Sequence, residues 1–397
     1  MRSDAPPEDR HLARALASVC LLGWALATNY TNHASLFPVL MERLGFGPAQ
    51  AGLLSTAFFV SLAMVSVPAG VLSDRLGPKR IGSLGLALTF LSNVGLGFAR
   101  DFTDLLAIKL FGGVGAGMAF IAGVRYVTVV FPPSRIHRAQ GLYGGCSHLG
   151  AGTSLYLVPL LYTLLDWRAT FIWSSGPVAA SLGLWMLLAP DRRMTLPTSR
   201  PGEAIRSGTI WLLGLVHTST FGLSVLVGTW ITTFLVRDLD LALVPAGWVG
   251  SGILVAGIIA RPTGGILIER RWLLPTTMIR AALLTSALGL ALLALPGRPL
   301  RAALAAIIAM GITMSIPYSA VMNTASAALP RSPGAAVGMV GGLALLMIAI
   351  GAPAVGALYT WTETFSFPFG LLGVFCLLIF WMAHRISPRA ERSDPDA

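Results

Sequence analysis

The chain has 397 residues and a formal net charge of +11; it is 55% hydrophobic, only 11% charged, and has a mean hydropathy of +0.74. Soluble domains carry about 25% charged residues, so these values exclude a large soluble globular protein. They predict an all-α integral membrane protein, because helices satisfy their own backbone hydrogen bonds in lipid.

Apolar runs of about 20 residues, long enough to cross a bilayer, recur along the whole chain. They predict twelve transmembrane helices, at 17–41, 50–73, 81–99, 105–131, 139–165, 169–189, 209–236, 246–268, 274–295, 302–329, 335–361 and 366–386. The polar connection at 190–208 separates two sets of six. We therefore expect an N-terminal tail (1–16), a six-helix bundle (17–189), a linker (190–208), a second six-helix bundle (209–388) and a C-terminal tail (389–397).

The basic residues are unevenly distributed among the connections. Eighteen Lys and Arg lie in the two tails and in the connections on the same side as the tails. The opposite connections hold six: Arg43, Arg100, Arg168, Arg237, Arg298 and Arg301. The positive-inside rule therefore predicts cytoplasmic termini and a cytoplasmic linker, in the inner (plasma) membrane of the cell. The high net charge follows from this topology and does not indicate a nucleic-acid partner.

The residue types needed for catalysis or metal binding are not combined in the spans. Cys20, Cys146 and Cys376 all fall within spans, so neither a disulfide framework nor a metal site is predicted. A Ser-His-acid triad needs an orienting carboxylate, and no span has an acid in its interior. We expect no enzyme activity, no cofactor and no metal. The expected partners are a small substrate and the lipid bilayer, with the chain acting as a monomer.

Several polar residues in the spans are candidate substrate ligands. Helix one carries Asn29, Tyr30 and His33, helix five carries His148 and helix seven carries His217. Each His lies about nine residues from a span end, close to the midplane at 1.5 Å per residue. For each His taken alone, the alternative interpretation is a neutral residue that hydrogen bonds within the helix packing.

Two arginines inside spans are further candidates: Arg125 in helix four, and Arg261 in the stretch GILVAGIIARPTGGILIERR of helix eight (252–271). A buried Arg costs about 2.5–3.5 kcal/mol on insertion scales, and no span offers it an acid. Glycines at 250, 257 and 264 share the helix face of Arg261, as expected for close packing or a cavity wall. The alternatives are snorkelling to the cytoplasmic interface, for both arginines, or bonding of Arg261 to backbone freed by Pro262.

The two halves of the chain are weakly repeated. GVLSDRLG (70–77) follows helix two and GILIERRW (265–272) follows helix eight, whereas AQGLYGG (139–145) and AVGMVGG (336–342) open helices five and eleven. Transporters that are built from two such halves bind substrate near the midplane, between the repeats. The repeat therefore predicts two pseudo-symmetric bundles.

The loop after helix two resembles a signature of the major facilitator superfamily. GVLSDRLGPKR (70–80) is similar to its loop 2–3 motif, and KLFGGVG (109–115) resembles its helix-four motif, with Lys109 where Arg is usual. This resemblance implies the major facilitator fold, with six plus six helices, and alternating access. It also implies a cytoplasmic conformational latch formed by Gly70, Asp74 and Arg75, with Glu269 and Arg270 in the second copy.

GLYGGCSHLG in helix five and ARPTGG in helix eight are similar to segments of nitrate/nitrite and cyanate-type porters. This narrower resemblance implies that Arg261 is a substrate ligand. The porters have Asn where this chain has His148. Nitrate porters also have a second substrate Arg in helix two, and LAMVSVPAG (62–70) has none. The resemblance thus implies a small anion without selecting nitrate.

We therefore predict a secondary transporter of a small anion that is nitrate-, nitrite- or cyanate-like or a small carboxylate, with Arg261 as its principal ligand. The alternative substrate is a small organic acid such as formate, oxalate or a monocarboxylate, moved by symport or exchange. Proton-driven drug efflux is disfavoured, since it typically uses a membrane carboxylate and a Gly-Pro motif in helix five. A non-transporting sensor with the same fold is a further alternative.

Overall fold

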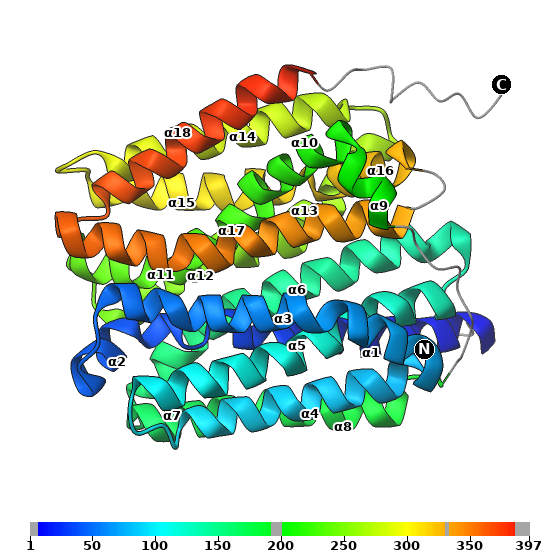
Figure 1. Ribbon diagram of the computed structural model, residues 1–397, viewed down its shortest axis with the longest axis horizontal. Helices are drawn as coiled ribbons and strands as arrows, with labels where there is room; N and C mark the ends of the chain where they lie inside the picture. The colour runs from blue at the N-terminus through cyan, green and yellow to red at the C-terminus, as the bar shows by residue number, and fades with distance from the viewer. Residues whose placement is uncertain (1–6, 192–200, 330–332, 386–397) are drawn as a thin grey trace, which may run out of the picture. The chain divides into compact units, whose positions relative to one another are not determined.

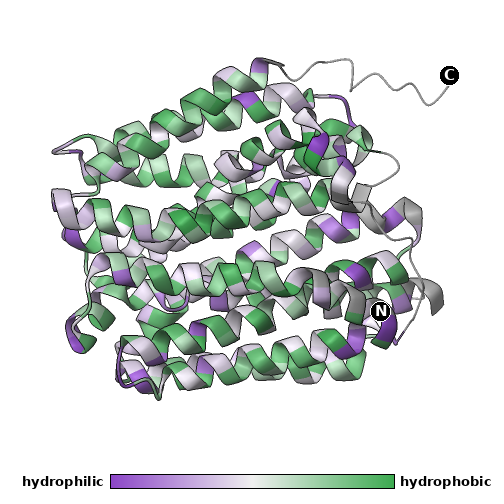
Figure 2. Ribbon diagram, in the orientation of Figure 1, coloured by the Kyte–Doolittle hydropathy of each residue, from purple (hydrophilic) through white to green (hydrophobic). Residues whose placement is uncertain are grey.

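The computed structural model describes residues 7–191, 201–329 and 333–385, whose regular elements are all helices, with no strand among them (Figure 1). Hydrophobic residues run along the helices, and hydrophilic residues concentrate near their ends (Figure 2). The predicted all-α class is confirmed. Residues 192–200 of the predicted 190–208 linker, and residues 386–397, lie outside the described part.

The chain divides into two compact units. Unit 1 comprises Met1–Gly45 and Ala57–Leu196, and unit 2 comprises Phe46–Thr56 and Pro197–Ala397. The start of the second predicted span therefore groups with the C-terminal half of the chain.

The elements from α1 to α8 cover the first half of the chain. They are α1 (Pro7–Thr31), η1 (Ala34–Leu36), α2 (Phe37–Leu44), α3 (Pro48–Leu76), α4 (Pro78–Leu96), α5 (Phe102–Val130), α6 (Pro133–Tyr162), α7 (Trp167–Ser174) and α8 (Gly176–Leu188). Proline stands in the first turn of α4, α6 and α8, where its missing N–H costs nothing. Asp101 and Asp166 cap α5 and α7 by accepting backbone N–H groups of the first turn.

The elements from α9 onward cover the second half. They are α9 (Pro201–Arg206), α10 (Gly208–His217), the π-helical turn η2 (Thr218–Gly222), α11 (Leu223–Arg237), α12 (Leu243–Val255), α13 (Gly257–Glu269), α14 (Pro275–Ala294), α15 (Leu300–Ser315), α16 (Tyr318–Ala328), α17 (Pro333–Thr362), α18 (Ser366–Met382) and η3 (Ala383–Arg385). Every predicted span coincides with one or more of these helices.

Nine helical stretches in the described residues are long and apolar enough to cross a membrane. The predicted spans outside that set are α4, α6 and α18. The helices α4 and α6 have 19 and 30 residues, so they are long enough but more polar, and α18 is apolar with 17 residues. The chain is thus a multi-pass membrane protein.

Several spans that the sequence predicts as continuous are interrupted. Helix one stops at Thr31, helix six at Ser174, helix eight at Val255 and helix ten at Ser315, while helix seven contains η2. Proline explains the breaks at Pro177 and Pro317, because it removes a backbone donor and restricts the preceding residue. Irregular backbone at membrane depth is tolerated where it is buried in protein or lines a water-filled cavity. Three of the five interruptions meet at the candidate site.

Candidate substrate-binding site

Arg261 lies on α13, four residues after the helix resumes at Gly257, and is only 5% exposed. A glycine on its helix permits close packing, because a Cβ at Gly264 would clash with the carbonyl oxygen of Ile316. Gly250 lies on α12, before the break, where a Cβ would lie 2.7 Å from Cγ2 of Ile231. The face of α13 that carries Arg261 therefore packs against the break between α15 and α16.

The two aromatic rings around Arg261 come from the other irregular helices. Tyr318 is the first residue of α16, directly after the Ile316–Pro317 break, and Phe221 lies in the π-helical turn η2. The guanidinium carbon of Arg261 is 4.2 Å from the ring centroid of Tyr318 and 5.7 Å from that of Phe221. Both distances are within the range of cation–π attraction.

His217 joins the same group of side chains. Its ring stacks on Phe221, with centroids 5.2 Å apart and planes at 13°, and lies 6.0 Å from the ring of Tyr318. We call His217, Phe221, Arg261 and Tyr318 the Arg261 cluster. Isolated π-helical turns occur frequently at functional sites, and here η2 separates His217 from the continuation of its helix.

The charge of the Arg261 cluster is positive. The acids of the described part of unit 2 are Glu203, Asp238, Asp240, Glu269 and Glu363, and all of them lie at helix ends or in connections. The cluster itself combines one permanent cation with aromatic rings and one imidazole. Stacking uses the face of a guanidinium and leaves its N–H edges able to bind a planar oxyanion. This arrangement suits an anion.

Unit 1 holds a second buried cation that the sequence did not single out as a site residue. Lys109 on α5 is 0% exposed, and its Nζ donates to the backbone O of Asn29 (2.6 Å), to Oδ1 of Asn29 (2.7 Å) and to Oδ1 of Asn32 (3.2 Å). The Phe58 ring lies 4.4 Å from this nitrogen. The Nδ2 of Asn32 donates in turn to Oδ1 of Asn93 at 2.9 Å. The three ammonium N–H groups thus match three acceptors.

The predicted ligands of helix one lie in and beside this network. The amide of Asn29 binds Lys109, and Tyr30 packs edge-on against Phe58 and Phe59. His33 is fully buried in the break after α1, with its ring 5.4 Å from that of Phe37. The polar face of helix one therefore packs inside unit 1. The only sequence signal for Lys109 was its place in the helix-four motif.

The remaining predicted ligands of unit 1 are Arg125 and His148. Arg125 on α5 is half-buried, and His148 on α6 is buried. Of the seven predicted ligands, Arg261 and His217 lie against the same two aromatic rings, those of Phe221 and Tyr318. The other five belong to unit 1.

The latch residues are described only in part. Arg75 and Arg270 are exposed, and the guanidinium of Arg270 lies 5.1 Å from the Trp272 ring. A Cβ at Gly70 would lie 3.8 Å from Cγ2 of Ile121, which is ordinary contact. The side chains of Asp74 and Glu269 lie outside what the structure describes.

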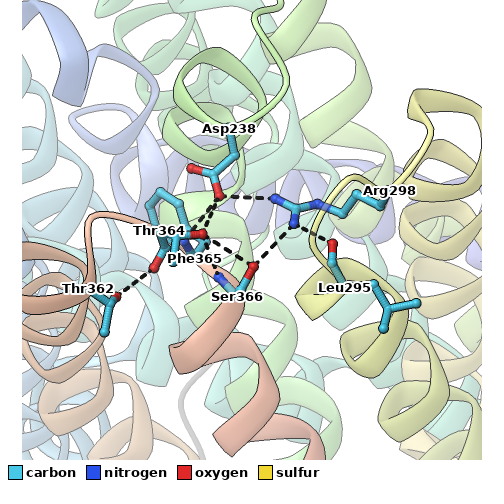
Figure 3. Close-up of polar contacts among 7 residues, drawn as sticks. All are labelled: Asp238, Leu295, Arg298, Thr362, Thr364, Phe365 and Ser366. Carbon is cyan, nitrogen blue, oxygen red and sulfur yellow. Dashed lines mark hydrogen bonds and ion pairs between the residues drawn. The ribbon is translucent and has the colours of Figure 1, made fainter.

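The connections at the opposite end of unit 2 share a buried ion pair (Figure 3). Arg298 Nη2 is 3.0 Å from Oδ2 of Asp238, and both side chains are less than a tenth exposed. The same carboxylate oxygen accepts from the Thr364 hydroxyl (3.2 Å) and from the Phe365 backbone N–H (3.1 Å). Arg298 also donates to the carbonyl oxygen of Leu295 at 2.9 Å. The pair joins the connections after α11, α14 and α17.

Among the described residues, no group of three or more His, Cys, Asp or Glu side chains is placed to hold a metal ion.

Comparisons with known proteins agree with this architecture. The sequence model of the Major Facilitator Superfamily matches residues 19–332. A probable sulfoacetate transporter of Cupriavidus necator is 25% identical over 287 residues, covering 66% of this chain and 65% of that protein. A nitrite extrusion protein of Bacillus subtilis is 22% identical over 269 residues, covering 66% of each chain. The matched region thus spans less than two thirds of either relative.

A solved structure has the same fold. The chain superposes on a bacterial homologue of the human lysosomal transporter Spinster, in an inward-facing and occupied conformation, with a TM-score of 0.76. The match covers 97% of this chain and 99% of the other at 16% sequence identity, so it supports the fold alone.

Proposed function

The chain belongs to the Major Facilitator Superfamily, and from this premise we propose that it is a secondary transporter of a small anion with Arg261 as the principal ligand. Transport proceeds by alternating access, as in other transporters that are built from repeated halves. The anion is nitrate-, nitrite- or cyanate-like or a small carboxylate. Asp74 and Arg75, with Glu269 and Arg270, act as the cytoplasmic latch that biases the conformational equilibrium.

The observation that carries the proposal is the buried, stacked guanidinium of Arg261. It sits 4.2 Å from the Tyr318 ring, beside His217, and the acids in the described part of this unit lie at helix ends or in connections. An ionisable residue inside a membrane protein is a functional-site hypothesis by default, and unlike Lys109 and Arg298, Arg261 lies among aromatic rings at a helix break. We infer that the substrate anion neutralises this cation.

The relatives support an anionic substrate. One is named for sulfoacetate and another for nitrite, and both compounds are oxyanions. Because both matches are distant and partial, they favour the class of substrate rather than one compound. A small organic acid such as formate, oxalate or a monocarboxylate, moved by symport or exchange, is the second candidate, favoured by the carboxylate of sulfoacetate.

The experiment that tests the proposal has two parts. Purified protein is first screened by thermal shift against nitrate, nitrite, cyanate, formate, oxalate, lactate and cationic drugs, since a bound ligand raises apparent stability by mass action. The stabilising anion is then used as a labelled substrate in proteoliposomes. We expect stabilisation by anions and saturable uptake. Stabilisation by cationic drugs alone contradicts the proposal, and binding without uptake indicates a sensor.

A further inference from the structure

Hydroxyl groups in these helices usually bond to their own helix. Thr313 on α15 donates to the carbonyl oxygen of Ala309 at 2.8 Å, and Ser286 on α14 donates to that of Ala282 at 2.7 Å. This bond satisfies a hydroxyl without any other partner. Ser315 and Ser319 differ. Within the described part of the chain, the buried Oγ atoms of both have no hydrogen-bond partner.

The two serines flank the break that places Tyr318 against Arg261. Ser315 ends α15 and Ser319 is the second residue of α16, with Ile316 and Pro317 between the helices. On the facing helix, a Cβ at Gly265 would lie 3.7 Å from the Oγ of Ser319. Gly265 is one helical turn beyond Arg261. Ser319 therefore lies beside α13 close to the Arg261 cluster.

A third polar atom in the same region is without a partner. It is Nδ1 of His217, which belongs to a buried ring in contact with both Phe221 and Tyr318. Native structures leave few buried polar atoms unsatisfied, and each one needs an explanation, a bound ion or ligand among them. The three atoms come from α10, α15 and α16, at the helix break that places Tyr318 against Arg261, and are therefore candidates to bind a polar molecule there.

We propose that Ser315 and Ser319 are specificity-determining residues of the Arg261 site, which donate hydrogen bonds to an anion oxygen beyond the two that Arg261 binds. The guanidinium fork matches two oxygens of a planar group, and the Ser hydroxyls on the neighbouring helix donate hydrogen bonds to a third oxygen. The favoured substrate is then an anion with a three-oxygen head group, or a carboxylate with an adjacent hydroxyl. This inference rests on the proposed function, because it takes Arg261 as the ligand.

The test uses two pairs of singly charged anions that differ by one oxygen: nitrate against nitrite, and glycolate against acetate. Dissociation constants are measured on the purified full-length protein by thermal-shift titration. We expect the wild type to bind nitrate and glycolate about ten-fold more tightly than their partners, because a site with placed donors discriminates against the analogue that cannot accept. Ser315→Ala and Ser319→Ala should each weaken nitrate and glycolate about ten-fold and nitrite and acetate less than about three-fold.

The melting temperature without ligand separates binding from structure. Removing a hydroxyl that has no partner should leave the ligand-free protein as stable as the wild type or more stable. The matched control is Ser286→Ala, a buried Ser of the same unit whose hydroxyl bonds to its own helix. This control should leave all four dissociation constants unchanged.

Three results overturn the inference. They are an equal loss of affinity for both members of each pair, unchanged affinities with a lowered melting temperature, and no binding of any of the four anions by the wild type. If Arg261→Ala abolishes binding and the serine variants change nothing, this inference fails and the proposed function stands. If Arg261→Ala binds as the wild type does, the proposed function itself fails.

Discussion

The guanidinium of Arg261 lies over the ring of Tyr318, with its carbon 4.2 Å from the ring centroid. Because Tyr318 begins α16 immediately after a helix break, the ring depends on that break for its position. A stacked guanidinium cannot swing freely toward the cytoplasm, so this contact opposes snorkelling. The aromatic partner thus fixes the position of the cation through its face.

This contact predicts different effects for two substitutions of Tyr318. Tyr318→Phe keeps the aromatic face and should retain substrate affinity within about three-fold. Tyr318→Leu removes the cation–π attraction of about 0.5–2 kcal/mol, so affinity should fall roughly three- to thirty-fold. Thermal-shift titration with the stabilising anion measures both. Equal affinities for the Phe and Leu variants would contradict a positioning role for the ring.

The buried amine of Lys109 leads to a prediction about stability. Lys109→Met preserves length but removes the donor to both oxygens of Asn29, whereas Oδ1 of Asn32 still accepts from the His33 backbone N–H. Each unsatisfied buried group costs about 1–3 kcal/mol, partly offset because the buried charge is gone. We expect the free energy of unfolding to fall by a net amount on the order of 2 kcal/mol, seen as a lower melting temperature in detergent. The exposed residue Arg43 provides the control variant Arg43→Met, which should melt like the wild type.

The ion pair of Asp238 and Arg298 should be a stability determinant of unit 2. Asp238→Asn leaves the Arg298 guanidinium buried without its counter-charge, and breaking such a pair costs about 3–5 kcal/mol. The matched control is Asp240→Asn. Asp240 is exposed and has a φ of 52°, a backbone conformation that Asn tolerates well. If both variants melt at the same temperature, the ion pair does not stabilise unit 2 as argued.

The sequence predicted the helices better than it predicted their neighbours in space. Apolar runs located every span, because the bilayer fixes the length and composition of a crossing helix. Pro317 gave a local signal for the break in helix ten, but nothing in TSTFG (218–222) marks a π-helical turn. Phe221 and Tyr318 were missed as partners of Arg261, since one sequence does not reveal contacts between distant segments. The burial of Lys109 was missed for the same reason.

Membrane orientation is a prediction from charge alone. A single Cys at Ser199, in a protein whose three natural cysteines are replaced by Ala, should resist a membrane-impermeant thiol reagent in intact cells. It should react after the membrane is opened, because the linker is expected to be cytoplasmic. Arg100→Cys in the same background is the control. Arg100 is exposed in a connection expected on the other side, so it should react in intact cells. The opposite pattern would invert the topology.

Substitutions of Arg261 test the central claim that the anion neutralises this cation. Arg261→Ala should abolish nearly all binding and uptake at equal membrane expression, because the cluster then has no permanent charge. Arg261→Lys keeps the charge but replaces a planar fork by a point charge that also stacks less well on Tyr318. We expect it to fold and to lose at least about ten-fold in affinity, since a bidentate pair becomes a single contact.

The Lys variant is the decisive one, because the snorkelling interpretation makes the opposite prediction for it. Lys snorkels as well as Arg does, so a residue that only extends its charge to the interface tolerates the change. Near-wild-type uptake by Arg261→Lys would therefore remove Arg261 as the ligand. Loss of uptake with an unchanged ligand-free melting temperature places the defect in binding. The fold then tolerates the loss of the guanidinium, and the substrate does not.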